Sequence, residues 1–235
     1  MDYGINIDTV YQKVLAIANK EQRGYITPQE FNLFADQAQL QIFEQYFFDI
    51  NQFNRVPGNQ TEYSDPLDIL DEKISLFKKK TTITHLGNHL YQVPSNSYKI
   101  STLSLADGTE IQEISSKELL SVQNSLLLKP RLNQPVYIRY ERNAGDYVIE
   151  AFPKEMSNTI IADYIKKPSK PNWSYVVVNE QALYDSTYAV DFELHPSEEG
   201  NLVFKILQLA GITMDPTLYQ IAAQEEIKEI QQQKQ

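Results

Sequence analysis

Residues 25–53 constrain the fold more than any other part of this sequence, because they predict one long, well-capped helix. Thr27 fits the N-cap, Pro28 the first helical position and Glu30 the third, so a capping box is expected. A helix that packs on one side needs only one apolar stripe, whereas this segment carries apolar residues on two sides. We therefore expect the helix to be held from two directions, which favours an assembly role over a catalytic one.

The two apolar sides follow from the helical period of 3.6 residues. The first face consists of Phe31, Ala35, Ala38, Ile42 and Tyr46. The second face, roughly opposite, consists of Leu33, Leu40, Phe43, Phe47 and Ile50. Either the chain's own core buries both faces, or the first lies in the core and the second meets a neighbouring copy. In the second case we expect Phe31, Ala38 and Ile42 in the core. The predicted interface residues on this helix are Leu33, Leu40, Phe43 and Phe47.

The composition bounds the possible chemistry of the chain. It has 235 residues, of which 42% are hydrophobic, and it contains no cysteine. The absence of cysteine excludes a disulfide framework, a thiolate zinc site and a cysteine nucleophile. We find no signal peptide and no long apolar run, so no membrane association is expected. The net charge of −10 argues against broad gripping of nucleic acid, although it does not exclude a protein that lets DNA pass.

Helical patterns flank a region of strand patterns. Apart from the long helix, the helices are expected at residues 8–19, 66–80, 197–210 and 216–230. The run of lysines at 78–80 is interpreted as the end of the third helix, where cations favour the helix dipole. A short helix at 117–123 is expected to be capped by Ser115 with Glu118.

The strand patterns lie between these helices. A hairpin is expected at 81–94, two strands at 97–114, three strands at 136–168, and single strands at 175–178 and 190–194. The hairpin turn is expected at Gly87 and Asn88. Because the connections are short, the natural expectation is an antiparallel meander.

This order predicts an α+β fold, with a helical body built from the N- and C-terminal helices and a small antiparallel β-sheet or sandwich domain inserted into it. The expected parts are an N-terminal helical part at 1–80, an antiparallel β domain with loops at 81–195, and C-terminal helices at 196–235 that rejoin the helical body.

Few residues suggest a reaction centre. His85 and His89 straddle the predicted turn and have no third ligand nearby, so metal binding there is not expected. Asp191, Glu193 and His195 would share one face of a strand and form a possible site for a divalent metal, as in a metal-dependent hydrolase, but a solvated strand face is the favoured interpretation. The sequence carries no nucleophile elbow, phosphate loop or zinc-protease motif. We therefore predict no enzyme activity, no cofactor and no metal.

The single tryptophan, Trp173, lies in a loop bounded by prolines. Together with the tyrosine-rich strands it is compatible with a carbohydrate-binding module, in which aromatic rings stack on sugars. The favoured interpretation is a loop anchor on its own domain.

Three blocks in the same order carry a family resemblance. They are YITPQEFNLFADQAQLQIFEQYFFDINQF at 25–53, IADYIKKPSKPNW at 161–173 and DFELHPSEEGNLVFKILQLAGI at 191–212, followed by a Glu- and Gln-rich terminal segment. In these blocks the sequence resembles virion structural proteins of tailed bacteriophages, especially crAss-like and marine short-tailed phages. The resemblance implies an adaptor or ring protein of the head-to-tail connector, below the portal, with about a dozen copies around the DNA channel.

The resemblance also implies the partners. These would be a homo-oligomeric ring, the portal protein, adjacent connector or tail proteins, and genomic DNA that passes through without sequence-specific binding. The segment 215–235 matches the part that docks on the portal, with Ile221, Ile227 and Ile230 as its predicted contacts. The protein would reside in the virion, after assembly in the cytoplasm of the host bacterium. Part of the negative charge is expected to line the channel. The alternatives are another virion part, such as a tail hub, tail-tube or stopper protein, and the carbohydrate-binding module.

Overall fold

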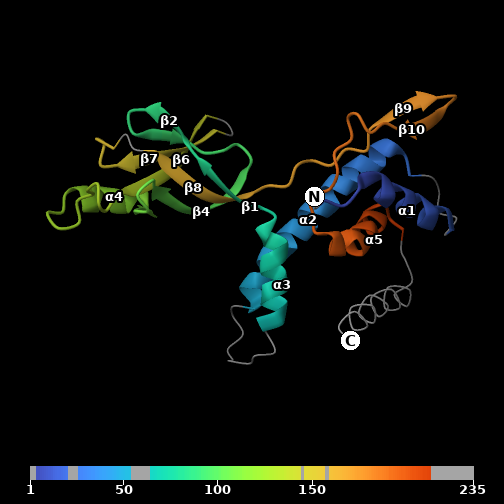
Figure 1. Ribbon diagram of the computed structural model, residues 1–235, viewed down its shortest axis with the longest axis horizontal. Coiled ribbons are helices and arrows are strands. Elements are labelled where there is room, and N and C mark those ends of the chain that lie inside the picture. Colours follow the sequence, from blue (N-terminus) through green and yellow to red (C-terminus); the bar gives the residue numbers. More distant parts are fainter. Residues whose placement is uncertain (1–3, 21–25, 54–63, 144–145, 157–158, 213–235) are drawn as a thin grey trace. The chain divides into compact units, whose positions relative to one another are not determined.

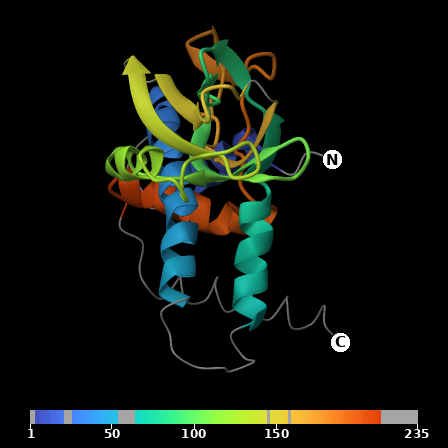
Figure 2. The ribbon, with the colours of Figure 1, turned by 90° about the vertical axis from the view of Figure 1, so that its left-hand side faces the viewer.

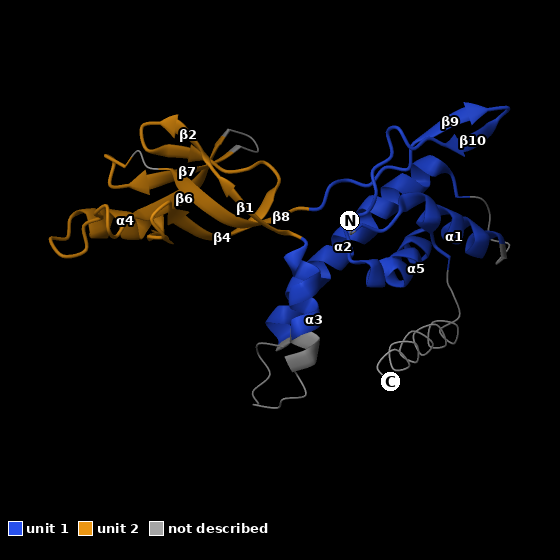
Figure 3. Ribbon diagram, viewed as in Figure 1, with its two compact units in different colours: residues 1–76, 168–235 blue, residues 77–167 orange. Residues whose placement is uncertain are grey.

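The computed structural model describes residues 4–20, 26–53, 64–143, 146–156 and 159–212. The chain forms two compact units (Figure 1, Figure 3). Unit 1 combines residues 1–76 with residues 168–235, and unit 2 comprises residues 77–167. The segment 168–195, which the sequence assigned to the β domain, thus belongs to unit 1.

The helices of unit 1 come from both ends of the chain. They are α1 (Ile7–Lys20), α2 (Pro28–Phe53), α3 (Ser64–Ser75), the 3₁₀ turn η2 (Pro196–Glu198) and α5 (Glu199–Leu209). Helix α5 packs against both α1 and α2, and α3 lies alongside the C-terminal half of α2 (Figure 2). The last predicted helix, at 216–230, lies outside the described residues.

Helix α2 begins as its sequence predicts. The Thr27 amide donates to the Glu30 carboxylate at 2.9 Å, and the Glu30 amide donates to the Thr27 hydroxyl at 3.3 Å, which completes the capping box. The first apolar face is buried in unit 1, and the prediction of Phe31, Ala38 and Ile42 as core residues is confirmed.

Unit 2 is built around one eight-stranded sheet. Its strands are β1 (Lys78–Thr82), β2 (Thr84–Gly87), β3 (Leu90–Gln92), β4 (Ser97–Leu105), β5 (Glu110–Glu113), β6 (Val136–Asn143), β7 (Asp146–Phe152) and β8 (Ile160–Lys166). They are arranged in the order β1-β8-β4-β5-β6-β7-β3-β2. Helix α4 (Ser116–Gln123) connects β5 to β6 and carries the predicted cap, a capping box between Ser115 and Glu118.

The sheet nearly closes on itself because its two edge strands, β1 and β2, are separated by Ile83 alone. The Ile83 side chain is buried, and its amide donates to the Ile160 carbonyl at 3.0 Å. One apolar cluster fills unit 2, with members that include Ile83, Tyr91, Leu103, Ile149, Met156 and Ile160. A second, smaller cluster joins α4 to the sheet through Leu119, Val136, Ile138 and Phe152.

The predicted fold class is wrong. The protein is a mixed α/β protein dominated by the large, nearly closed sheet, rather than a helical body with a small inserted β domain. Strands account for 32% of the structure and helices for 37%, so the sheet is no minor insertion. The expected antiparallel meander is also wrong, because neighbours in the sheet are not always neighbours in the sequence. Strand β8 pairs with both β1 and β4, far away in the sequence, and β5 pairs with β6 in parallel.

Two local expectations also fail. Lys78, Lys79 and Lys80 do not end a helix but form most of β1, an edge strand whose backbone pairs with β8. The predicted strand at 190–194 contributes only isolated bridges, from Val190 to Asn172 and from Phe192 to Ile5. In both places long-range pairing decides the conformation, and a local pattern does not encode it.

Candidate assembly surfaces

The second face of α2 is divided between core and surface. Leu33 is 63% exposed, Leu40 and Phe47 are half-buried, and Phe43 is only 1% exposed. Phe43 packs edge-on against the Phe47 ring, with ring centroids 5.0 Å apart. Of the predicted interface residues on α2, only Leu33 is largely exposed. The half-buried Leu40 and Phe47 follow it at intervals of seven residues along the same stripe of the helix.

The other predicted interface residues, Ile221, Ile227 and Ile230, lie outside the described residues. A membrane span is not found among the described helices, because none of them is both long and apolar enough to cross a bilayer.

A two-stranded hairpin in unit 1, residues 175–184, forms a second apolar surface, which we call the arm. Its strands are β9 (Tyr175–Val178) and β10 (Gln181–Tyr184), which pair with each other in a sheet of two strands (Figure 1). The two turn residues, Asn179 and Glu180, have φ values of 50° and 65°. Positive φ at both positions belongs to the tight hairpin turn that matches the natural twist of the strands.

The arm exposes apolar side chains on both of its faces. Val176 pairs directly with Leu183 across the ladder, so these two residues and Val178 lie on the same face of the hairpin. All three side chains are exposed. Val177 lies on the other face and is 63% exposed. An isolated two-stranded hairpin is marginally stable in water, so such a surface gains stability when another surface covers it.

The base of the arm is held firmly in unit 1 by Trp173. This side chain is 2% exposed, and its indole nitrogen donates to Asp8 at 2.9 Å. The rings of Tyr175 and Tyr184 lie 5.7 and 5.8 Å from the Trp173 ring. Trp173 is therefore the loop anchor that the sequence favoured, and its burial leaves no ring face open for stacking on a sugar.

Two amide side chains of α2 fix the segment that leads into the arm. Asn32 accepts from the Trp173 amide at 2.7 Å and donates to the Trp173 carbonyl at 3.1 Å. Gln39, fully buried, donates to the Ser169 carbonyl at 2.8 Å and accepts from the Glu193 amide at 2.9 Å. Asn32 and Gln39 are seven residues apart on one face of α2, so both side chains reach the segment that leads into the arm, and Gln39 also binds the backbone at Glu193.

The third apolar surface belongs to unit 2, and we call it the leucine loop. Leu126, Leu127 and Leu128 follow α4 in a series of turns and are 93%, 87% and 66% exposed. Leu120 on α4 and Leu132 farther along are exposed as well. Burying apolar surface contributes about 25 cal/mol for each Å² removed from water. Three consecutive exposed leucines contribute none of this stabilisation until a partner covers them.

The arm and the leucine loop differ in charge. The leucine loop is accompanied by three exposed cations, Lys117, Lys129 and Arg131. The arm instead carries the exposed Glu180 in its turn and Asp185 just beyond β10. The nearest acid to the leucine loop in sequence, Glu118, is committed to the N-terminus of α4 through its hydrogen bonds to Ser115.

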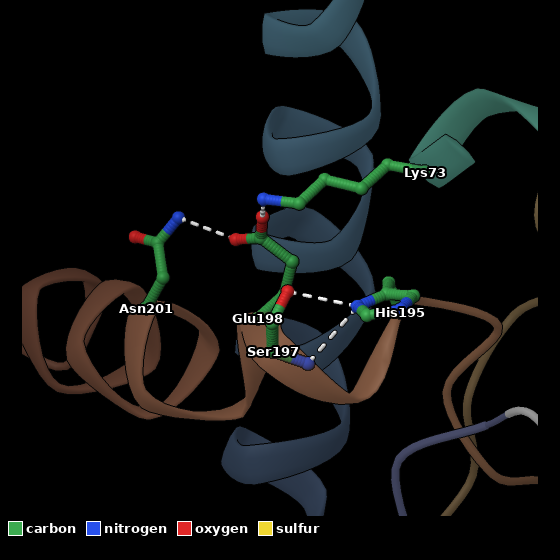
Figure 4. A network of polar contacts seen from close by, with 5 residues as sticks. All are labelled: Lys73, His195, Ser197, Glu198 and Asn201. Atoms are coloured by element: carbon green, nitrogen blue, oxygen red, sulfur yellow. Dashed lines mark hydrogen bonds and ion pairs between the residues drawn. The ribbon is translucent and has the colours of Figure 1, made fainter. Parts of the chain in front are cut away.

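Inside unit 1, a polar network ties α3 to the start of α5 (Figure 4). Lys73 lies 2.5 Å from Glu198, and Asn201 donates to the same carboxylate at 3.0 Å. Burial by itself raises the pKa of Glu198, but the hydrogen bonds from Lys73 and Asn201 and the Lys73 charge outweigh it and lower that pKa overall. The Tyr46 hydroxyl is buried beside Glu198, and burial, followed by the Glu198 charge, raises the pKa of Tyr46.

The residues considered for metal chemistry have structural tasks. Asp191 accepts from the Ile7 amide at 2.8 Å, and Glu193 binds the backbone amide and the hydroxyl of Ser169. His195 caps η2 by accepting from the Ser197 amide at 3.2 Å (Figure 4). Within the described part of the chain, no group of three metal-ligating side chains is assembled.

The two histidines near the first hairpin also remain apart from any such group. The turn between β2 and β3 is formed by Asn88 and His89, one residue beyond the predicted Gly87 and Asn88, and Gly87 ends β2. The centroid of the His85 ring lies 4.8 Å from that of Tyr91. His89 instead lies 2.9 Å from Glu150 on β7, which fixes the end of the turn to the neighbouring strand.

Sequence reasoning missed both the arm and the leucine loop. Only β9 was expected, although two residues between VVV and QALY offered a hairpin spacing. The asparagine–glutamate turn lacks glycine, which is the usual signal for such a turn. The run SLLLKP at 125–130 shows neither helical nor strand periodicity, so its exposure was not foreseeable from pattern alone.

No family model matches this chain, and no curated protein matches it either.

Proposed function

We propose that this protein is a structural subunit of a tailed-phage virion, forming a ring of the head-to-tail connector below the portal. The three sequence blocks that resemble such proteins support this proposal, and two of them form α2 and the α5 region of unit 1. In this role the protein joins capsid to tail, surrounds the DNA channel and performs no catalysis.

The observation that carries the proposal is the leucine loop. Leu126, Leu127 and Leu128 are consecutive, and each is at least 66% exposed in the single chain. A monomeric protein gains nothing from presenting three such leucines to water, whereas a subunit of an assembly buries them against its neighbour.

Two further features favour an assembly. The arm has apolar side chains on both faces, and Leu33 on α2 is largely exposed although α2 runs through the core of unit 1. Contacts between unlike patches on successive copies generate rings when the rotation closes. The net charge of −10 suits a channel, because negative charge in the lumen repels DNA and prevents it from adhering during passage.

Co-expression with the portal protein from the same phage tests the proposal. We expect the two proteins to co-elute as one large complex, and negative-stain images to show the portal with an added ring. Leu127→Asp should reduce this ring, while Ala106→Asp, at an exposed turn between β4 and β5, should leave it intact. Binding to a tail protein but not to the portal would instead favour the alternative of a tail hub or tail-tube component.

A further inference from the structure

We infer that the arm of one copy packs on the leucine loop of a second copy of this chain, an interface that rests on the proposed ring function and deepens it. The two surfaces belong to different units and are made of different elements, a β-hairpin and a helix–loop segment. Their contact is therefore between unlike patches, which propagates from copy to copy as a ring requires.

The apolar content of the two surfaces is complementary. The arm offers branched residues, Val176, Val177 and Val178, and the leucine loop offers Leu126, Leu127 and Leu128. Pairing them covers the leucine loop and one face of the arm in one contact. Covering the arm also supports a hairpin that has only two strands within the described residues.

Charge distinguishes this pairing from self-association of either surface. Two leucine loops placed together would bring Lys129 and Arg131 against their own copies, and two arms would bring Glu180 against Glu180. Like charges across an interface are costly. Arm on leucine loop places Glu180 against the cations instead, so a second copy in the unlike arrangement is the occupant that the charges favour.

The firm base of the arm strengthens this contact. Trp173 is buried among aromatic rings and bonded to Asp8, and the chain before it is fixed to α2 by Asn32 and Gln39. The arm is thus presented as a preformed surface, which lowers the entropic cost of binding.

Cysteine cross-linking of the full chain tests the pairing directly, because the natural sequence contains no cysteine. Val177→Cys, labelled with ¹⁵N, is mixed with unlabelled Leu127→Cys under mild oxidation, and the covalent dimers are identified by mass spectrometry. Each variant carries a single thiol, so a mixed dimer can form only between two copies. The matched control replaces Leu127→Cys by Ala106→Cys, an exposed position outside the leucine loop.

We expect the mixed dimer of Val177→Cys with Leu127→Cys to form several-fold more than the control dimer, and more than either homodimer. Equal yields with the control, or a dominant homodimer of either variant, would overturn the pairing. The second outcome would mean that the surface associates with itself.

A charge exchange provides the second readout. Glu180→Lys alone should reduce the mixed dimer when introduced into the arm variant, and so should Lys129→Glu with Arg131→Glu in the loop variant. Combining the two sets should restore it. Both residues at position 180 have a Cβ, so the positive φ there is equally strained in either variant. Failure of the combination to restore the cross-link would contradict the role given to charge.

The outcomes separate this inference from the proposed function. Rings on the portal without the mixed cross-link would refute the pairing and leave the connector function standing. A mixed cross-link in a protein that does not join the portal would establish the interface and refute the connector function.

Discussion

The Lys73 Nζ atom lies 2.5 Å from the Glu198 Oε1 atom, and this ion pair fastens α3 to the turn that begins α5 (Figure 4). The two residues are separated by 125 positions in the sequence. Glu198 is buried, and the Lys73 side chain is only 20% exposed, so solvent screens the pair weakly. The pair thereby joins the N-terminal and C-terminal parts of unit 1.

Lys73→Met should destabilise unit 1, because it leaves the Glu198 carboxylate buried without its cation. Breaking a buried pair from one side costs about 3 kcal/mol. Urea unfolding monitored by Trp173 fluorescence measures this change. Lys13→Met is the matched control, since it removes a more exposed pair with Glu199 and should cost less than about 1 kcal/mol. Equal losses for the two variants would contradict the account.

The stability of unit 1 should fall in acid partly through Glu198. Its folded-state pKa is lowered below the ordinary value of 4.5, so its contribution is complete above that value and is lost as the pH falls through the lowered pKa. The free energy of unfolding should therefore decline as the pH falls below the ordinary value of 4.5. Glu198→Gln removes this titration and should flatten the decline, measured by urea unfolding at each pH. An unchanged slope would show that other carboxyls account for it.

Gln39→Leu should destabilise unit 1 although it makes α2 more apolar. The substitution leaves the Ser169 carbonyl and the Glu193 amide without their α2 partner, at about 2 kcal/mol. The control is Gln37→Leu, at an exposed position of the same helix, which should change the free energy of unfolding by less than about 0.5 kcal/mol. A neutral Gln39→Leu would mean that the segment 168–173 does not depend on the hydrogen bonds of Gln39.

On the second face of α2, substitution of the buried Phe43 and of the exposed Leu33 should affect different properties of the protein. Phe43→Ala creates a cavity in the core and should cost about 3 kcal/mol, whereas Leu33→Asp should leave the monomer's thermal unfolding nearly unchanged. If α2 also meets a neighbour, Leu33→Asp should still weaken assembly on the portal, as measured by sedimentation. Normal assembly of Leu33→Asp would remove this face from the interface.

Trp173, the only tryptophan, should report on the base of the arm. Because its ring is buried, the native emission should be blue-shifted and weakly quenched by acrylamide. Titration with oligosaccharides should leave the emission unchanged. A saturable change with one sugar would revive the carbohydrate-binding alternative.

Local signals predicted much of unit 1 and most strands of unit 2, although β1 was mistaken for the end of a helix. The capping box at Thr27 and Glu30 located α2, and the one at Ser115 and Glu118 located α4, because caps depend on residues three apart. The sheet as a whole was not predictable in this way. Its closure depends on Ile83 passing between two edges, and on β8 pairing with strands that are distant in sequence.

The candidate surfaces were predictable only in part. The helical period of the apolar residues on α2 placed Leu33 on the second face, and Leu33 is exposed. The same pattern placed Phe43 on that face, although the Phe43 ring is buried. Phe43 lies at the border of the second face, beside the buried Gln39 and Tyr46, so its ring falls inside the core. The exposure of Leu127 follows from turns after α4, which have no periodic signature.

Electron cryomicroscopy of the virion neck would locate this chain in the assembled particle. We expect repeated density for both units of this chain in one ring between portal and tail, with a β-hairpin of each subunit seated on the leucine loop of the next. Density for the chain elsewhere in the virion, or a neck that contains no copy of it, would contradict the account.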